Sequence, residues 1–241
     1  MQQNTLDIVG EIHPTNVLRT IISLVDLKRY DLSTLANNFI RINNNEPHLF
    51  ADESQLDQWA KYLIGKIDFS DEKVVEKMKA ELICPDEPEF DLEKEIATQM
   101  RFVARMFSEE FELITSRGYN LLFTEGSSLT LNPLGEYAKN KGLDLVYLDN
   151  DFLPYTLIQH DRLMGIDRSL SDIEQQDREL HWLVDKVFPS KADLGSALMV
   201  VGQNHVDDKF GLIQRLNHYG VSYNVVFRGK EILNQVRRQD R

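Results

Sequence analysis

The chain has 241 residues, of which 42% are hydrophobic and 27% charged, and its formal net charge is −12. This size is enough to bury a core, and no apolar run reaches the roughly 18 residues of a membrane-spanning helix, so we expect no membrane contact. The acidic balance argues against nucleic acid as a partner. The opening residues lack a secretory signal pattern and Cys84 is the single cysteine, so we expect a cytoplasmic protein without disulfides.

The negative charge is unevenly distributed. Residues 46–95 hold 15 acidic residues against 6 lysines, a balance of −9 that leaves −3 for the rest of the chain. Within a single α/β domain spanning residues 1–241, we therefore predict an acidic, mainly helical insertion at residues 31–91. This insertion could be a solvated cap, a lid over a site, or a surface that docks a protein partner.

Short apolar runs predict five buried strands, which lie in chain order at residues 6–9, 120–123, 143–148, 197–201 and 222–227. Helical periodicity covers residues 92–117, 153–187 and 210–218. The second of these is expected to break near Gly165 or residues 169–171, where Ser171 and Glu174 form a capping box. The alternation predicts an α/β fold, a mostly parallel sheet with flanking helices and the acidic insertion between strands one and two.

Polar side chains follow four of the predicted strands. In open parallel sheets ligands bind beyond the carboxyl ends of the strands, so these side chains are candidates for a site. They are Glu11 and His13 after the first strand, Glu125 after the second, Asp149 and Asp151 after the third, and His205 after the fourth. Asp149 and Asp151 fit a metal or substrate hydroxyl as well as they fit a turn that caps a helix.

Two of these histidines belong to Gly-x-x-His motifs, Gly10 to His13 and Gly202 to His205. Glycine permits a sharp exit from the strand and a close approach of the backbone to a ligand. Imidazole and carboxylate groups suit zinc, manganese or cobalt. The same groups could instead act without metal as general base and acid.

Three segments together resemble the TraB/Tiki-like superfamily, whose relatives include erythromycin-esterase-like and ChaN-like haem-binding proteins. They are GEIH at 10–13, TEG at 124–126 and VVGQNHVDDKFGLIQRLNHYGVSYNVV at 200–226. The pair Asp177-Arg178 is similar to an Arg-Asp or Arg-Asn-type pair that precedes the last motif in that family. The resemblance extends over roughly half of the chain and does not include residues 31–91.

The resemblance implies a hydrolase of ester or peptide bonds that acts on a small-molecule or peptide substrate. It implies that His13, His205, Glu11 and Glu125 are ligands of a divalent metal or acid–base residues that activate water. Arg178 would hold an anionic substrate group or orient a glutamate. We place Asp149 and Asp151 with Arg178 as substrate-binding candidates.

A binding protein without turnover is the rival interpretation. The same crevice could hold haem, because paired histidines suit haem iron, or residues 31–91 could dock a partner. Among the other histidines, His160 and His181 are interpreted as structural, although His181 lies close enough to Arg178 in sequence to support a site. His48 and His218 are expected at the surface.

Overall fold

The computed structural model describes residues 5–13, 65, 70–73, 75–76, 91–128, 133–164, 166, 168–190 and 194–239. The chain divides into two compact units. The first comprises Met1–Ile12 and Ile114–Gly229, and the second comprises His13–Leu113 and Lys230–Arg241.

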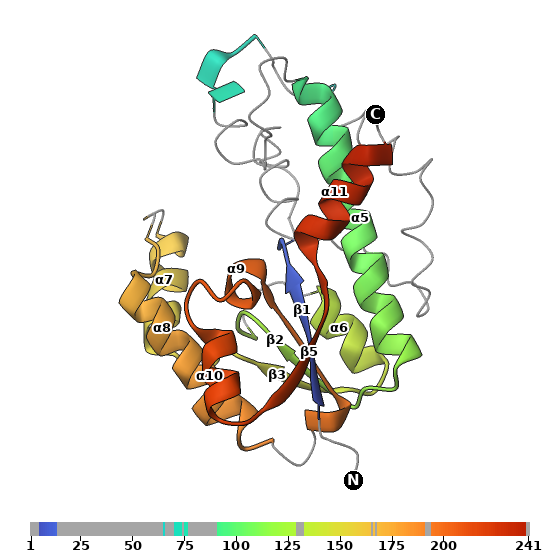
Figure 1. The fold of residues 1–241 in the computed structure, drawn as a ribbon. Helices are drawn as coiled ribbons and strands as arrows, with labels where there is room; N and C mark the ends of the chain where they lie inside the picture. Colours follow the sequence, from blue (N-terminus) through green and yellow to red (C-terminus); the bar gives the residue numbers. More distant parts are fainter. Residues whose placement is uncertain are drawn as a thin grey trace. The chain divides into compact units, whose positions relative to one another are not determined.

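A five-stranded sheet forms the centre of the first unit (Figure 1). Its strands are β1 (Thr5–Glu11), β2 (Leu121–Thr124), β3 (Asp144–Tyr147), β4 (Ala197–Gly202) and β5 (Ser222–Arg228). They lie in the order β3-β2-β4-β1-β5, and every neighbouring pair is parallel. The predicted α/β fold with a mostly parallel sheet is confirmed.

Helices alternate with these strands in the first unit. They are α6 (Pro133–Asn140), α7 (Leu153–Leu163), α8 (Asp172–His181), the π-helix η2 (Trp182–Val187), the 3-10 turn η3 (Leu194–Ser196), α9 (Gln203–Val206) and α10 (Leu212–His218). The predicted break before Ser171 is confirmed, because α7 ends at Leu163 and a capping box starts α8. Ser171 Oγ accepts from Glu174 N at 3.3 Å, and Ser171 N donates to the Glu174 carboxylate at 2.9 Å.

Apolar side chains on one face of the sheet form the core of this unit. Ile8, Phe123 and Met199 are fully buried there, in one cluster with Trp182 of η2 and Leu216 of α10. Helix α6 packs against β2 and β3 on the opposite face (Figure 1). Each strand contains a short run of apolar residues, such as residues 121–123 in β2, which is why the strands could be predicted from the sequence.

Between β1 and β2, the described residues 72–73 and 75–76 and α5 (Leu92–Ser116) are helical. Most of α5 belongs to the second unit, together with α11 (Gly229–Gln239) after its first residue. These two helices are joined by an ion pair of 2.7 Å between Arg237 and Glu95. The regularly spaced apolar residues of α5 are buried as its periodicity predicted, namely Ile96, Met100, Val103, Phe107, Phe111 and Ile114.

Most of residues 31–91 lie outside the described residues, so the prediction of a lid or partner surface there stays a prediction. Within the described part of the chain, every helix is too short or too polar to cross a bilayer.

Candidate functional site

Three strand ends meet at the carboxyl edge of the sheet. Glu125 directly follows β2, and its Oε2 accepts a hydrogen bond of 2.6 Å from the backbone N–H of Gly202, the last residue of β4. Gly202 is in turn paired in register with Glu11, the last residue of β1. The strand-end prediction thus brings Glu11, Glu125 and the turn that carries His205 to one place.

The direction of the strand order reverses at this edge. From β2 the chain continues to β3, away from β4, whereas from β4 it continues to β5 in the opposite direction. The connections that leave β2 and β4 therefore diverge, and such a reversal is where open parallel sheets bind ligands. Glu125 and His205 stand at the ends of these two strands.

His205 is held at the edge by the short helix α9, which packs against β1. A Cβ atom at Gly10 would lie 3.0 Å from Val206 Cγ2 and 3.4 Å from the Cα atom of Gln203. The glycine of the first Gly-x-x-His motif lies within β1 and makes room for α9. Its role in this structure is to let α9 approach, so the expectation that it turns the chain is corrected.

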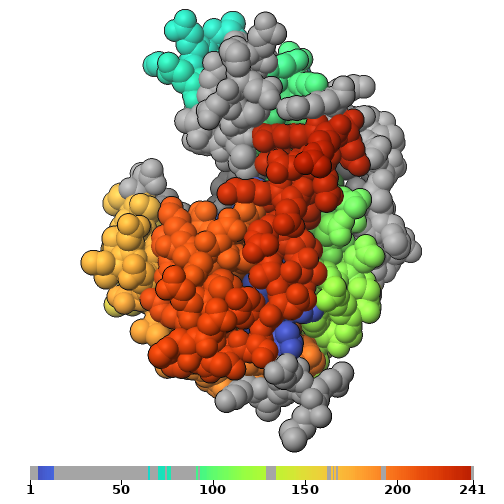
Figure 2. Space-filling view, in the orientation of Figure 1, coloured from blue at the N-terminus to red at the C-terminus, as the bar shows by residue number. Residues whose placement is uncertain are grey.

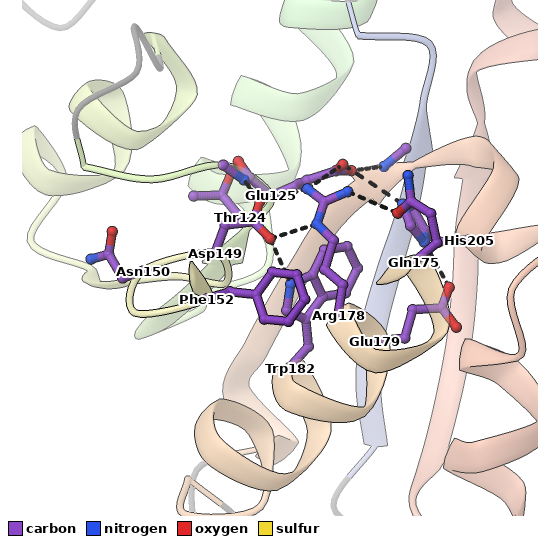
Figure 3. A network of polar contacts seen from close by, with 12 residues as sticks. Thr124, Glu125, Asp149, Asn150, Phe152, Gln175, Arg178, Glu179, Trp182 and His205 are labelled. Carbon is purple, nitrogen blue, oxygen red and sulfur yellow. Dashed lines mark hydrogen bonds and ion pairs between the residues drawn. The ribbon is translucent and has the colours of Figure 1, made fainter. Parts of the chain in front are cut away.

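The imidazole of His205 lies between two carboxylates (Figure 3). Its Nδ1 lies 2.7 Å from Glu179 Oε1, and its Nε2 lies 3.6 Å from Glu125 Oε1. Glu179 is fully buried on α8, and its other oxygen accepts a hydrogen bond of 3.0 Å from Arg215 Nη1. Nδ1 of the ring is therefore fixed by Glu179, while Nε2 faces the ends of the strands.

Arg178 ties the ends of β2 and β3 together. Its Nε and Nη2 donate to the two oxygens of Asp149 at 2.6 and 2.5 Å, and Nη2 also lies 2.8 Å from Glu125 Oε1. The remaining nitrogen, Nη1, donates to Gln175 Oε1 at 3.3 Å. With all three nitrogens engaged, Arg178 fits the role of orienting a glutamate. We call Glu125, Asp149, Gln175, Arg178 and Trp182 the Arg178 network.

Aromatic rings complete the surroundings of Arg178. Its Cζ lies 5.0 Å from the ring centre of Tyr155 and 4.7 Å from that of Trp182, distances at which a cation is attracted to a ring face. Trp182 Nε1 donates to Asp149 Oδ1 at 2.9 Å, and its ring lies 4.8 Å from that of His205. Trp182 is the first residue of the π-helix η2, and π-helical turns are frequent at functional sites.

Burial and charge set the protonation of these groups. Burial by itself would lower the pKa of His205, but the carboxylates of Glu125 and Glu179 outweigh it and hold this pKa above its usual value. Burial raises the pKa of Glu179 by more than His205 and Arg215 lower it. Burial also opposes the charge of Arg178, yet Glu125 and Asp149 keep its pKa above the ordinary one. The His205–Glu179 pair therefore binds a proton more tightly than the isolated groups would.

The other predicted site residues lie in different surroundings. The side chain of Asp149 is fully buried within the Arg178 network and also accepts from Gly126 N at 2.7 Å. The Asp151 side chain is 87% exposed and pairs with Lys186 at 3.3 Å, so the structure does not bring it to the network. His13 is the first residue of the second unit, and its pairing with His205 stays a prediction.

The remaining histidines follow their interpretation in part. His160 is exposed, with Nδ1 3.7 Å from Asp161 Oδ1, and His218 is exposed as expected. His181 has its Nδ1 2.7 Å from Asp185 Oδ2 and its Nε2 3.2 Å from the Asn150 carbonyl, which ties η2 to the loop after β3. His48 lies outside the described residues.

A metal does not fit the donor set described here. Both oxygens of Glu125 are engaged, by Arg178 and by Gly202 N. A dication at Nε2 of His205 would also stand beside the Arg178 guanidinium. The contact of Nδ1 with Glu179 is itself compatible with a ligand at Nε2, because metal-binding histidines ordinarily bond a carboxylate through their other nitrogen. Among the described residues, no group of three or more His, Cys, Asp or Glu side chains is arranged to hold a metal ion.

No protein-family model, curated protein or solved structure matches this chain. The resemblance to the TraB/Tiki-like superfamily therefore stays a prediction.

Proposed function

We propose that this protein is a hydrolase of ester or peptide bonds in which His205 transfers the proton. The observation that carries the proposal is the alignment of Glu179, His205 and Glu125 at the reversal of strand order. A carboxylate on Nδ1 fixes the tautomer and orientation of a histidine, which leaves Nε2 as the reacting nitrogen.

The proposed reaction uses this nitrogen twice. In its neutral form, whose share grows as pH rises through the raised pKa of the ring, His205 takes a proton from water at Nε2 while the water oxygen bonds to the carbonyl carbon of the substrate. The imidazolium that forms is stabilised by Glu179 and Glu125. It then gives the proton to the leaving oxygen or nitrogen as the bond from carbon to that atom breaks.

The roles that we propose for Glu125 and Arg178 follow from their contacts. Glu125 stands 3.6 Å from Nε2, and its side chain keeps 12% of its surface exposed, so we assign it to the wall that a substrate reaches first. Arg178 holds Glu125 in place through their ion pair of 2.8 Å. A divalent metal and haem remain predictions from the resemblance, and no step of this proposal uses either.

The proposal is tested with a panel of activated esters and peptides. We expect hydrolysis by the wild-type protein and a loss of about 10²- to 10⁴-fold in kcat/KM for His205→Gln. His218→Gln, which changes an exposed histidine on α10, serves as the matched control and should keep full activity. Unchanged activity in His205→Gln would contradict the assignment of His205.

Two further measurements separate the rival functions. Loss of hydrolysis after treatment with a chelator, and its return with zinc, manganese or cobalt, would favour a metal-dependent reaction. Absence of hydrolysis across the panel, together with a Soret band after addition of haem, would favour the ligand-binding interpretation.

A further inference from the structure

Exposed apolar side chains are concentrated on one part of the first unit. Seven of the eight large hydrophobic residues that the described part of the chain exposes fall between residues 153 and 184. Soluble proteins rarely gather such residues without an interaction that covers them. They are Leu153 and Leu157 of α7, Met164 and Ile166 in the loop that follows, and Ile173, Leu180 and Val184 of α8 and η2.

The spacing of Ile173, Leu180 and Val184 places them on one side of the continuous helix that α8 and η2 form. Leu180 follows Ile173 by seven residues, two helical turns, and Val184 follows Leu180 by four. They are exposed by 72%, 39% and 46% respectively. We call Ile173, Leu180 and Val184 the outer stripe. The opposite side of the same helix carries Arg178 and Trp182 of the Arg178 network, both buried.

Helix α7 lies beside α8 and adds to this surface. Phe152 stacks on His181 at 5.5 Å, and Tyr155 faces Arg178, so the start of α7 is packed against α8. Leu153 and Leu157 are one turn apart and are exposed by 65% and 43%. In Figure 2 the yellow and orange surface of this segment borders solvent at the side of the molecule.

Charge decides which partner this surface fits. Every exposed charged side chain on α8 and η2 is an aspartate, Asp172, Asp177 or Asp185, and the remaining exposed residues there are apolar or Gln176. A second copy of the chain would place these carboxylates against one another, which is unfavourable. Asp177 follows Ile173 by four residues and precedes Leu180 by three, so it lies on the same side of the helix as the outer stripe. A helix that presents apolar residues with lysine or arginine among and beside them complements both features.

We propose that the outer stripe, with Leu153 and Leu157, is a docking surface for a basic amphipathic helix of a partner protein. Such a helix would lay its leucine- or isoleucine-type residues along the stripe and its basic residues near the three aspartates. The proposal does not depend on the proposed hydrolase activity. It adds a means by which a partner could act on the helix that holds Glu179 against His205.

The surface is tested with the full-length protein and a labelled helical peptide of leucine and lysine, about 18 residues long so that the helix can form. A matched peptide carries glutamate in place of lysine. We expect saturable binding of the basic peptide only. In fluorescence anisotropy, Ile173→Ser/Leu180→Ser/Val184→Ser should weaken binding at least about tenfold. Asp172→Asn/Asp177→Asn/Asp185→Asn should weaken it severalfold and reduce its dependence on salt.

The matched control is Tyr219→Ser, which removes the eighth exposed hydrophobic residue, 46% exposed and outside this segment. It should bind the peptide as the wild type does. Equal binding of both peptides, or unchanged binding by the triple serine variant, would overturn the proposal. So would a dimer in sedimentation that the triple serine variant abolishes, or binding of the wild type to phosphatidylserine vesicles through the same residues.

Discussion

Two charged clusters in the first unit use the same residue types in different surroundings. Asp7 of β1 accepts hydrogen bonds from Arg117 at 2.9 Å, Tyr119 at 2.5 Å and Asn224 at 3.1 Å. The Arg117 side chain is 45% exposed, whereas that of Arg178 is 5% exposed. The Asp7 cluster is partly exposed to solvent, whereas the Arg178 network is almost wholly buried.

This difference governs how strongly each residue should matter. When a partly exposed ion pair loses one member, water solvates the other, so the loss is small. When a buried ion pair loses one member, the other charge stays buried with neither a counter-charge nor water to stabilise it. Of the two clusters, only the Arg178 network contacts a histidine, His205, a residue type whose ordinary pKa lies near neutral pH. It is therefore the cluster that is suited to chemistry.

The largest effect should follow from removing the central cation. Arg178→Met leaves Asp149 and Glu125 without a counter-charge, and we expect the free energy of unfolding to fall by about 3–5 kcal/mol. Arg117→Met should cost less than about 1 kcal/mol. Urea denaturation measures both. Arg178→Lys retains the charge without the paired hydrogen bonds and provides a milder variant in case Arg178→Met does not fold. Equal losses for Arg178→Met and Arg117→Met would contradict the claim that burial makes the Arg178 network the more important of the two clusters.

A second variant tests how α9 packs against β1 at Gly10. Gly10→Ala introduces a Cβ at 3.0 Å from Val206 Cγ2, and we expect a loss of about 1–3 kcal/mol in unfolding free energy. The double variant with Val206→Ala removes the clashing methyl groups, so its loss should be smaller than the sum of the two single losses. Additive losses would show that Gly10 does not act through this contact.

The dependence of stability on pH tests whether His205 carries its charge in the folded state. Because its folded-state pKa is raised, the folded protein holds this proton more tightly than the unfolded chain. The contribution is present below the usual histidine pKa of about 6.5 and is lost as pH rises through the folded-state value. The urea midpoint of the wild type should therefore fall more steeply above neutral pH than that of His205→Gln. Parallel curves would refute the assignment.

The smallest effect should appear at the exposed pair after β3. Asp151→Asn removes an ion pair whose carboxylate is 87% exposed, and we expect a change within about 0.5 kcal/mol by the same denaturation assay. A loss above about 2 kcal/mol would mean that the loop after β3 depends on this pair as the network depends on Arg178.

The sheet could be predicted because each strand contains a short apolar run, and the positions of Glu125 and His205 at strand ends could be predicted because both residues follow such runs. Glu179 and Arg215 were missed, because a buried carboxylate and its arginine resemble surface residues in an ordinary helical pattern. A signal was nevertheless present. Glu179 precedes the buried Leu183 by four residues, and Arg178 precedes the buried Trp182 by four, so both charges fall on the apolar side of their helix.

The π-helix and the division into two units could not be predicted from the sequence, for other reasons. A π turn differs from an α-helix by one extra residue, and the segment WLVDKV carries no glycine or proline to mark it. The single-domain prediction depended on charge and composition, which do not report where contacts become sparse. It remains a prediction beside the two compact units.

The spacing of the Arg178 network along the chain also bears on the order in which it can assemble. Asp149 and Arg178 are 29 residues apart, whereas Glu125 and Gly202 are 77 apart. Closing the shorter loop costs less conformational entropy, so the Asp149–Arg178 pair is the cheaper first contact. During synthesis both of its members leave the ribosome before Gly202 and His205 do. Strand β4 and the histidine that follows it then emerge after both members of this charge pair.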